Sequence, residues 1–162
     1  TIIHLAGEYF ALASGTKLLH VPFKGSAPAV VALLSGNVNI AFDTLTVLAP
    51  QVKSGKLKGI AIASKERSPL LPDLPTIAES GFPDFDVTSW FGLAAVAGTP
   101  REIIDRLNAE INAIAKQPAV REALTTQGLT AWPSTPEEFA QRIRADHVKY
   151  GEVVRNSNAT LD

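Results

Sequence analysis

Hydrophobic and polar residues alternate in short blocks along the first half of the chain, and glycine or proline closes most of these blocks. Blocks with apolar residues at helical spacing predict helices over about 3–13, 27–34 and 45–54, the last one broken and restarted at Pro50. Short apolar runs between the helices predict strands over 17–21, 38–42 and 57–63. Strands that alternate with helices are typical of an α/β fold with a mainly parallel sheet.

The pattern changes in the second half. A segment rich in proline and charge, 64–86, predicts a long loop with one short helix at 76–80, and the apolar run 87–97 is long for a single strand. Helices alone follow. Thr99 with Glu102, and Thr135 with Glu138, have the spacing of capping boxes that open two amphipathic helices, and a shorter helix is expected over 118–127.

Composition and charge limit the classes of partner and site. The chain has 162 residues, 46% of them hydrophobic, and a formal net charge of −1, so nucleic acid is not an expected partner. Cysteine is absent, which excludes disulfides, thiolate zinc sites and cysteine nucleophiles. His4 and Glu8 are spaced as two ligands of one helix, but no third ligand accompanies them, so no metal or cofactor is expected.

Neither a secretory leader nor a membrane-spanning segment is expected from the sequence. Thr1-Ile2-Ile3-His4 lacks a basic segment followed by an apolar core, so no signal peptide is visible. The longest apolar stretches are far shorter than the roughly 20 residues of a membrane helix.

A loop between an expected strand and an expected helix is the main candidate site. It reads His-Val-Pro-Phe-Lys-Gly-Ser-Ala-Pro over 20–28. Ser26 is expected to cap the helix, and the amides from Gly25 to Ala27 are expected to be free to bind an anion at the positive end of the helix dipole. Lys24 is a candidate for steering an anion, and Phe23 for walling a pocket. A well-capped turn with no ligand has the same local pattern.

A second turn of this kind follows the next expected strand. Asp43 and Thr44 stand there, and Asp43 is a candidate either to cap the next helix or to accept a hydrogen bond from a ligand amine or hydroxyl. Two neighbouring turns at the carboxyl edge of a parallel sheet mark the place where ligands bind in open α/β folds.

Common catalytic signatures are missing from the sequence. It contains no G-x-S-x-G, G-x-G-x-x-G, phosphate-loop or H-E-x-x-H pattern. One alternative hypothesis is a small hydrolase-like or isomerase-like enzyme fragment that uses His20 or Asp43 as its acid or base, and it requires a nucleophile and a base within hydrogen-bond reach. Another is an interaction domain with no pocket at the two turns.

Motifs along the whole chain resemble the solute-binding proteins of tripartite tricarboxylate transporters, also called Bug receptors. The resemblance begins with the loop at 20–28 and continues through Phe-Asp at 42–43, Ser-Gly-Lys-Leu at 54–57, Arg-Ser-Pro at 67–69, Leu-Pro-Thr-Ile-Ala-Glu-Ser-Gly at 74–81, Ser-Trp-Phe-Gly-Leu at 89–93 and Gly-Thr-Pro at 98–100.

This resemblance implies a periplasmic receptor, not an enzyme, with a type II periplasmic-binding-protein-like fold of two α/β lobes. It implies that residues 1–94 form the second lobe and that 95–162 form a crossover and helices that pack on the first lobe, much of which is absent from this chain. Small organic carboxylates and membrane transporter subunits are the implied partners. The implied ligand-binding residues are Phe23, Lys24, Gly25, Ser26, Ala27, Asp43 and Thr44.

The state of association also follows from this interpretation. If the first lobe is largely absent, the helices that would pack on it leave their apolar faces exposed. We therefore expect this chain to self-associate.

Overall fold

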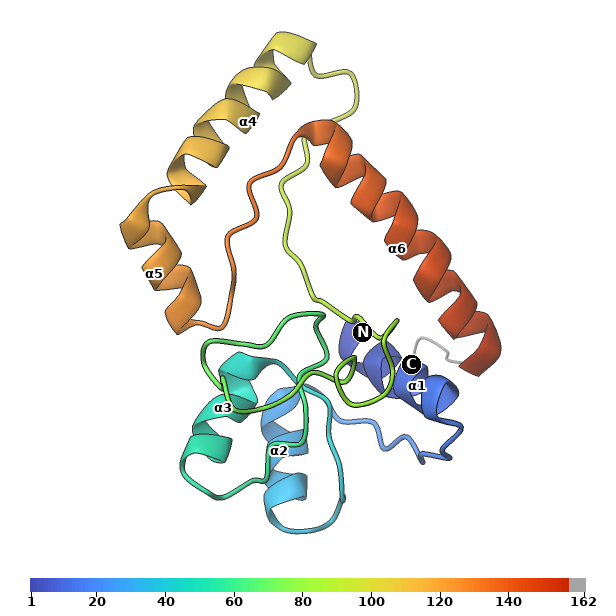
Figure 1. The fold of residues 1–162 in the computed structure, drawn as a ribbon. Coiled ribbons are helices and arrows are strands. Elements are labelled where there is room, and N and C mark those ends of the chain that lie inside the picture. The colour runs from blue at the N-terminus through green and yellow to red at the C-terminus, as the bar shows by residue number, and fades with distance from the viewer. Residues whose placement is uncertain (158–162) are drawn as a thin grey trace. The chain divides into compact units, whose positions relative to one another are not determined.

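The computed structural model describes residues 1–157, in which six helices are connected by loops (Figure 1). The helices are α1 (Ile2–Ser14), α2 (Ser26–Leu34), α3 (Leu45–Lys53), α4 (Arg101–Ala115), α5 (Pro118–Thr126) and α6 (Pro136–Ser157). The chain divides into two compact units. Unit 1 comprises residues 1–89 together with the chain from 152 onward, and unit 2 comprises 90–151. The assignment of 1–94 and 95–162 to parts of a two-lobed receptor stays a prediction. Among the described residues, no helix is long and apolar enough to cross a membrane.

The three helices of unit 1 lie where the apolar spacing predicts them. The Thr1 side chain caps α1 by accepting a hydrogen bond from the amide of His4, and Gly15 ends the helix at a positive φ of 67°. The expected break at Pro50 is wrong, because α3 continues through this residue. Proline has no N–H to donate to the preceding turn, so the helix accommodates it at the loss of one backbone hydrogen bond.

An aromatic cluster forms the centre of unit 1. The Phe10 ring of α1 lies 5.9 Å from the Phe42 ring, 5.8 Å from the Phe82 ring and 6.2 Å from the Phe85 ring, measured between centroids. Tyr9 stacks on Phe85 at 4.9 Å, and Phe85 is only 2% exposed. Edge and offset contacts of this kind add to the stabilisation from burial. The cluster thus attaches α1 to the segment before α3 and to the loop at 64–86.

The mainly parallel sheet that the sequence predicts is not confirmed. Residues 1–157 contain no named strand, and the described pairing is one isolated parallel bridge between Ile62 and Thr76. Around it, the Ile62 amide donates to the Pro75 carbonyl at 2.9 Å, and the Ile77 amide donates to the Ile62 carbonyl at 2.9 Å. A strand is stable only beside a neighbour about 4.8 Å away. Within residues 1–157, the segments 17–21 and 38–42 that the sequence predicts as strands are not in a strand, and Leu19 is 90% exposed.

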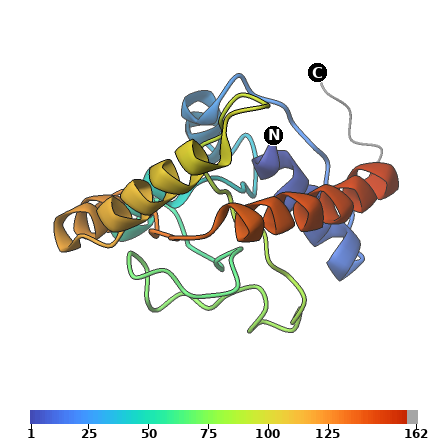
Figure 2. The ribbon, with the colours of Figure 1, turned by 90° about the horizontal axis from the view of Figure 1, so that it is seen from above.

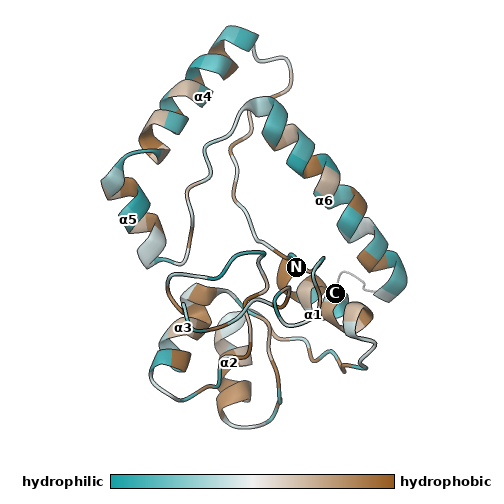
Figure 3. Cartoon of the chain, in the orientation of Figure 1, coloured by the Kyte–Doolittle hydropathy of each residue, from teal (hydrophilic) through white to brown (hydrophobic). Residues whose placement is uncertain are grey.

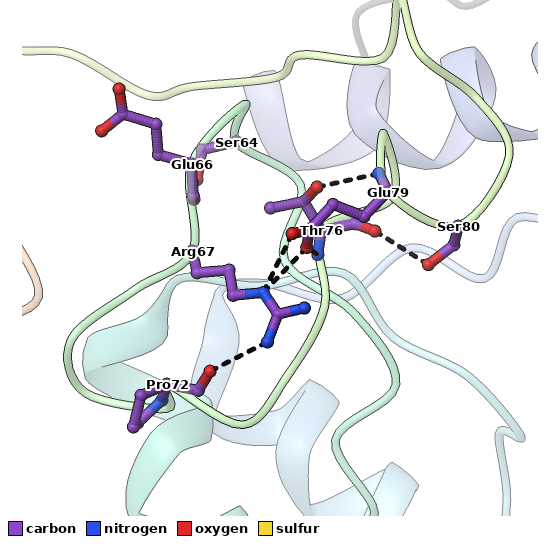
Figure 4. Close-up of polar contacts among 7 residues, drawn as sticks. All are labelled: Ser64, Glu66, Arg67, Pro72, Thr76, Glu79 and Ser80. Carbon is purple, nitrogen blue, oxygen red and sulfur yellow. Dashed lines mark hydrogen bonds and ion pairs between the residues drawn. The ribbon is translucent and has the colours of Figure 1, made fainter.

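The short helix expected at 76–80 is instead a hydrogen-bonded turn within a long loop region (Figure 2). The Thr76 amide donates to Glu79 Oε2 at 2.7 Å, and the Glu79 amide donates to Thr76 Oγ1 at 3.0 Å. Arg67 Nε donates to the same carboxylate at 2.9 Å, and its Nη1 donates to the Pro72 carbonyl at 3.3 Å (Figure 4). The Glu79 carboxylate thus connects Thr76 with Arg67, and Arg67 also binds Pro72, so the 64–80 loop is held together without a helix.

In unit 2, one of the two expected capping boxes is present. The Thr135 amide donates to Glu138 Oε2 at 2.8 Å, and the Glu138 amide donates to Thr135 Oγ1 at 3.1 Å, as predicted for the start of α6. The prediction of a capping box at Thr99 is wrong. The Thr99 hydroxyl donates to the carbonyl of Val96, three residues earlier, at 2.7 Å, and Pro100 is the N-cap of α4.

A buried carboxylate organises the packing of α6 within unit 2. Asp146 is 8% exposed, and its Oδ2 accepts hydrogen bonds from Trp90 Nε1 at 2.6 Å and from Arg142 Nε at 3.0 Å. The Trp90 ring meets the Phe139 ring edge-on at 5.2 Å. A Cβ atom at Gly92 would lie 2.1 Å from the Phe139 ring, so any other residue here would force this ring to move.

The helix α4 exposes a stripe of apolar side chains. None of its residues is buried. Apolar residues recur along the helix between polar ones (Figure 3). The stripe consists of residues that are 38% to 51% exposed, namely Ile103, Leu107, Ile111 and Ile114. A contiguous apolar surface of this kind favours association with another surface.

We predict that the turn at 76–80 weakens in acid. The Thr76 amide and the Arg67 guanidinium lower the pKa of Glu79 below its ordinary value of 4.5. A lowered pKa in the folded state means that stability from this carboxylate is present above about pH 4.5 and is lost as the pH falls through the lower folded value. Glu79→Gln should therefore melt earlier than the parent at about pH 7 and show a smaller further loss at about pH 3.5.

The matched control for this prediction is Glu66→Gln, because the Glu66 side chain has no described partner and points away from Arg67 in Figure 4. Thermal melts at both pH values provide the measurement. An equal acid loss in Glu79→Gln and in the parent would contradict the prediction.

We predict self-association of this chain through the α4 stripe. Light scattering should give a mass above the 17.2 kDa of one chain. Leu107→Lys should lower that mass, because it puts a charge into the stripe, whereas Ala109→Lys adds the same charge outside it. A strictly monomeric parent, or equal effects of the two substitutions, would count against this prediction.

Candidate ligand-binding site

The loop before α2 is shaped by a positive φ at Gly25. Gly25 has φ 97° and ψ 175°, a conformation that residues with a Cβ rarely adopt. The Gly25 amide donates to the Phe23 carbonyl at 2.9 Å, which closes a three-residue turn. The expectation that this amide is free for an anion is therefore wrong, because the turn that positions the loop uses it.

Within residues 1–157, the start of α2 has two free amide donors, although the Gly25 amide is occupied. Ser26 is the first helical residue and Gly25 is the N-cap. Among the described residues, the amides of Ser26 and Ala27 have no hydrogen-bond acceptor, as is general for the first turn of a helix. The positive end of the helix dipole lies at the same place. Two amides, and not the three expected, are available to an anion.

The Ser26 hydroxyl does not cap its own helix, which corrects the prediction from the sequence. It donates instead to Asp43 Oδ1 at 2.9 Å, and the amide of Thr44 donates to the same oxygen at 2.7 Å. Thr44 is the N-cap of α3, without a side-chain capping bond. The two strand-to-helix turns that the sequence singles out are thus in direct contact, and Asp43 is the group that connects them.

Phe23 and Lys24 lie on the exposed side of this loop. Phe23 is 39% exposed. Lys24 is exposed and has no ion pair among the described residues. The cationic side chain is therefore free to attract an anion toward the two amides. Asp43 accepts the hydrogen bond of the Ser26 hydroxyl. The amide donors of α2 and a carboxylate acceptor are therefore close together.

The histidines of unit 1 do not join this group. The His20 ring stacks on the His4 ring at 3.8 Å with 16° between their planes, and His4 Nε2 lies 3.2 Å from Glu8 Oε1. Within the described part of the chain, no histidine hydrogen-bonds to Ser26 or Asp43. The geometry required by the enzyme alternative is not found at these residues. Residues 1–157 also contain no group of three or more acidic or histidine side chains placed to hold a metal ion.

Sequence reasoning missed the contact between Ser26 and Asp43, which lie 17 residues apart. A signal for it exists: a hydroxyl and a carboxylate follow two consecutive expected strands, and such turns meet at one edge of a parallel arrangement. The local sequence instead favours both residues as helix caps, because each lies just before an expected helix.

We predict that Ser26 and Asp43 stabilise unit 1 as a pair. Ser26→Ala and Asp43→Ala should each lower the free energy of unfolding by about 1 kcal/mol or more, because each removes a charge-assisted hydrogen bond. In a double-mutant cycle measured by urea unfolding, the coupling energy should be about 1 kcal/mol. Ser35→Ala, which removes a hydroxyl bond to the Ala32 carbonyl at the other end of α2, provides the control. Strict additivity of the two substitutions would refute the pairing.

Comparison with known proteins identifies the family. The tripartite tricarboxylate transporter family receptor matches residues 1–159. The protein BugT of Bordetella pertussis is 38% identical over 158 residues, which cover 98% of this chain and 48% of BugT.

Solved structures have the same fold. An R. palustris protein solved with adipate superposes with a TM-score of 0.82 at 30% identity, over 98% of this chain and 53% of that chain. MatC from Rhodopseudomonas palustris, solved with bound malate, gives a TM-score of 0.76 at 34% identity, over 95% of this chain and 53% of that chain. The chain therefore spans about half the length of these relatives.

These similarities decide two predictions from the sequence. The periplasmic-binding-protein-like fold is confirmed by the structural neighbours, although its mainly parallel sheet is not. The matching family is one of receptors, so the prediction of a binding protein and not an enzyme is confirmed at the level of the family. The chain belongs to the tripartite tricarboxylate transporter receptor family.

Proposed function

We propose that this chain is the ligand-holding part of an extracytoplasmic receptor that captures a small organic carboxylate for a tripartite transporter. Family membership supports the receptor role. Two neighbours were solved with dicarboxylic acids, adipate and malate, which supports a carboxylate as the ligand. A receptor that delivers a solute to an importer works on the outer side of the membrane, so we assign the protein to the periplasm.

The observation that carries this proposal is the pair of free amides at the start of α2. The Ser26 and Ala27 amides have no acceptor among the described residues, and they lie at the positive end of the helix dipole. A carboxylate group has the charge and the acceptor geometry to bind there. Lys24 is exposed beside them and attracts the anion without a fixed contact.

Asp43 and Thr44 define the other side of the proposed site. One oxygen of Asp43, Oδ1, accepts hydrogen bonds from the Ser26 hydroxyl and the Thr44 amide. Its second oxygen has no described partner and is able to accept a hydrogen bond from a hydroxyl or ammonium group of the ligand. A second ligand carboxylate close to Asp43 would be repelled. We therefore place the ligand with one carboxylate on the α2 amides and its remaining polar groups directed away from, or donating to, Asp43.

Recognition through amides, with little help from side-chain charge, makes a clear prediction for substitutions. Ala27→Pro removes one N–H in the first turn of a helix, where proline is tolerated, and should weaken carboxylate binding by about tenfold or more. Ala27→Ser retains the N–H and should bind as the parent does. Lys24→Ala removes an exposed charge and should weaken binding only about two- to fivefold.

Thermal-shift and calorimetric titrations of this chain with mono-, di- and tricarboxylates provide the measurement. Stabilisation by at least one carboxylate is the expected result, and the absence of stabilisation by all of them would refute the proposed function. A larger effect of Lys24→Ala than of Ala27→Pro would mean that charge, and not the backbone, carries recognition.

A further inference from the structure

A groove of about 390 Å³ lies on the first half of α6, with all its lining residues within unit 2. The groove is open to solvent and not enclosed, and its volume is in the range of pockets that hold small ligands. The α6 residues of the groove recur at the i, i+3, i+4 and i+7 positions of one helix face, and the segment before the helix completes it. The lining consists of Trp132, Pro133, Glu138, Gln141, Arg142 and Ala145.

The guanidinium of Arg142 is held in a fixed orientation in this groove. Arg142 Nε donates to Asp146 Oδ2 at 3.0 Å, and Asp146 is itself buried and accepts Trp90 Nε1 at 2.6 Å. The Arg142 side chain is 28% exposed. Its two terminal nitrogens have no described partner within residues 1–157. A guanidinium that is oriented by a carboxylate behind it, with its fork still free, is well suited to bind a carboxylate.

An apolar wall lies beside this cation. Trp132 is 54% exposed, and Pro133 follows it in the lining of the same groove. An indole ring offers a flat apolar face for the body of a ligand and also interacts well with a guanidinium. Gln141 also lines the groove and adds amide donors. The groove thus combines one cation with an aromatic surface.

Glu138 restricts the charge of a ligand in this groove. Its Oε2 accepts the Thr135 amide in the capping box, so the carboxylate is held in place at the start of α6. It does not pair with Arg142 among the described ion pairs. A ligand with two carboxylates would place one of them near Glu138, where like charges repel. A single carboxylate on Arg142 avoids this cost.

We propose that this groove is a second binding site, for a monocarboxylate with an apolar body of about one ring. The carboxylate binds the free nitrogens of Arg142, and the ring packs on Trp132. The site differs from the α2 loop in both its residues and the ligand it favours, and it does not depend on the function proposed for that loop.

The test is a titration of this chain with 3-phenylpropanoate, followed by the NMR signals of the two indole N–H groups. The Trp132 signal should shift with a dissociation constant on the order of 1 mM, as expected for so small a ligand. Arg142→Gln should weaken binding about tenfold or more. Arg144→Gln is the matched control, because Arg144 is exposed on another face of α6 and has no described partner, and it should leave binding unchanged.

Ligand charge and a second variant complete the test. Phenylsuccinate should bind more weakly than 3-phenylpropanoate to the parent, and Glu138→Gln should reduce that difference. Trp132→Leu retains Arg142 and its contact with Asp146, so it tests the site even if Arg142→Gln folds poorly. Calorimetry measures how much more weakly Trp132→Leu binds 3-phenylpropanoate than the parent does.

The proposal is overturned if 3-phenylpropanoate causes no shift of Trp132 at about 10 mM, or if Arg142→Gln and Trp132→Leu bind it as the parent does. Ala27→Pro, which tests the α2 loop, should leave this binding intact. Failure of one site is therefore distinguishable from failure of the other.

Discussion

The packing of Phe10 against Phe42, Phe82 and Phe85 is the interaction on which unit 1 depends. These rings come from α1, from the segment before α3 and from the 64–86 loop, and Phe85 is almost completely buried. Because Phe42 directly precedes Asp43, the cluster also positions the carboxylate that connects the two turns of the proposed site. Apolar burial therefore positions the polar contact between Ser26 and Asp43, which are 17 residues apart in the sequence.

The polar groups of the proposed site are divided between structure and ligand. The Gly25 amide, the Ser26 hydroxyl and one oxygen of Asp43 are used to hold the two turns together. The amides of Ser26 and Ala27 remain free. A preorganised pair of donors binds an anion with little loss of conformational entropy, because the helix already holds both amides in position. This division explains how an ordinary start of a helix becomes a candidate for recognition.

The two carboxylates Asp43 and Asp146 have similar structural roles in the two units. Each accepts two donors through one oxygen, and each connects segments far apart in the sequence. Asp146 also orients Arg142, which leaves the terminal nitrogens of that side chain available in the proposed groove. The role of Asp43 does not follow from the local sequence, which favours a helix cap at this position.

The sequence by itself determined the helices, whose positions depend on local spacing and capping residues. The bounds of α1, α2 and α5, and the capping box at Thr135, agree with the pattern of the chain. The sequence motifs also identified the family and the two turns of the candidate site. Tertiary structure alone decided what the segments 17–21 and 38–42 do, because a strand forms only where another segment lies beside it. It also decided that Ser26 binds Asp43 and does not cap α2, since a hydroxyl chooses among all acceptors within reach and the folded chain brings the stronger, charged one to it.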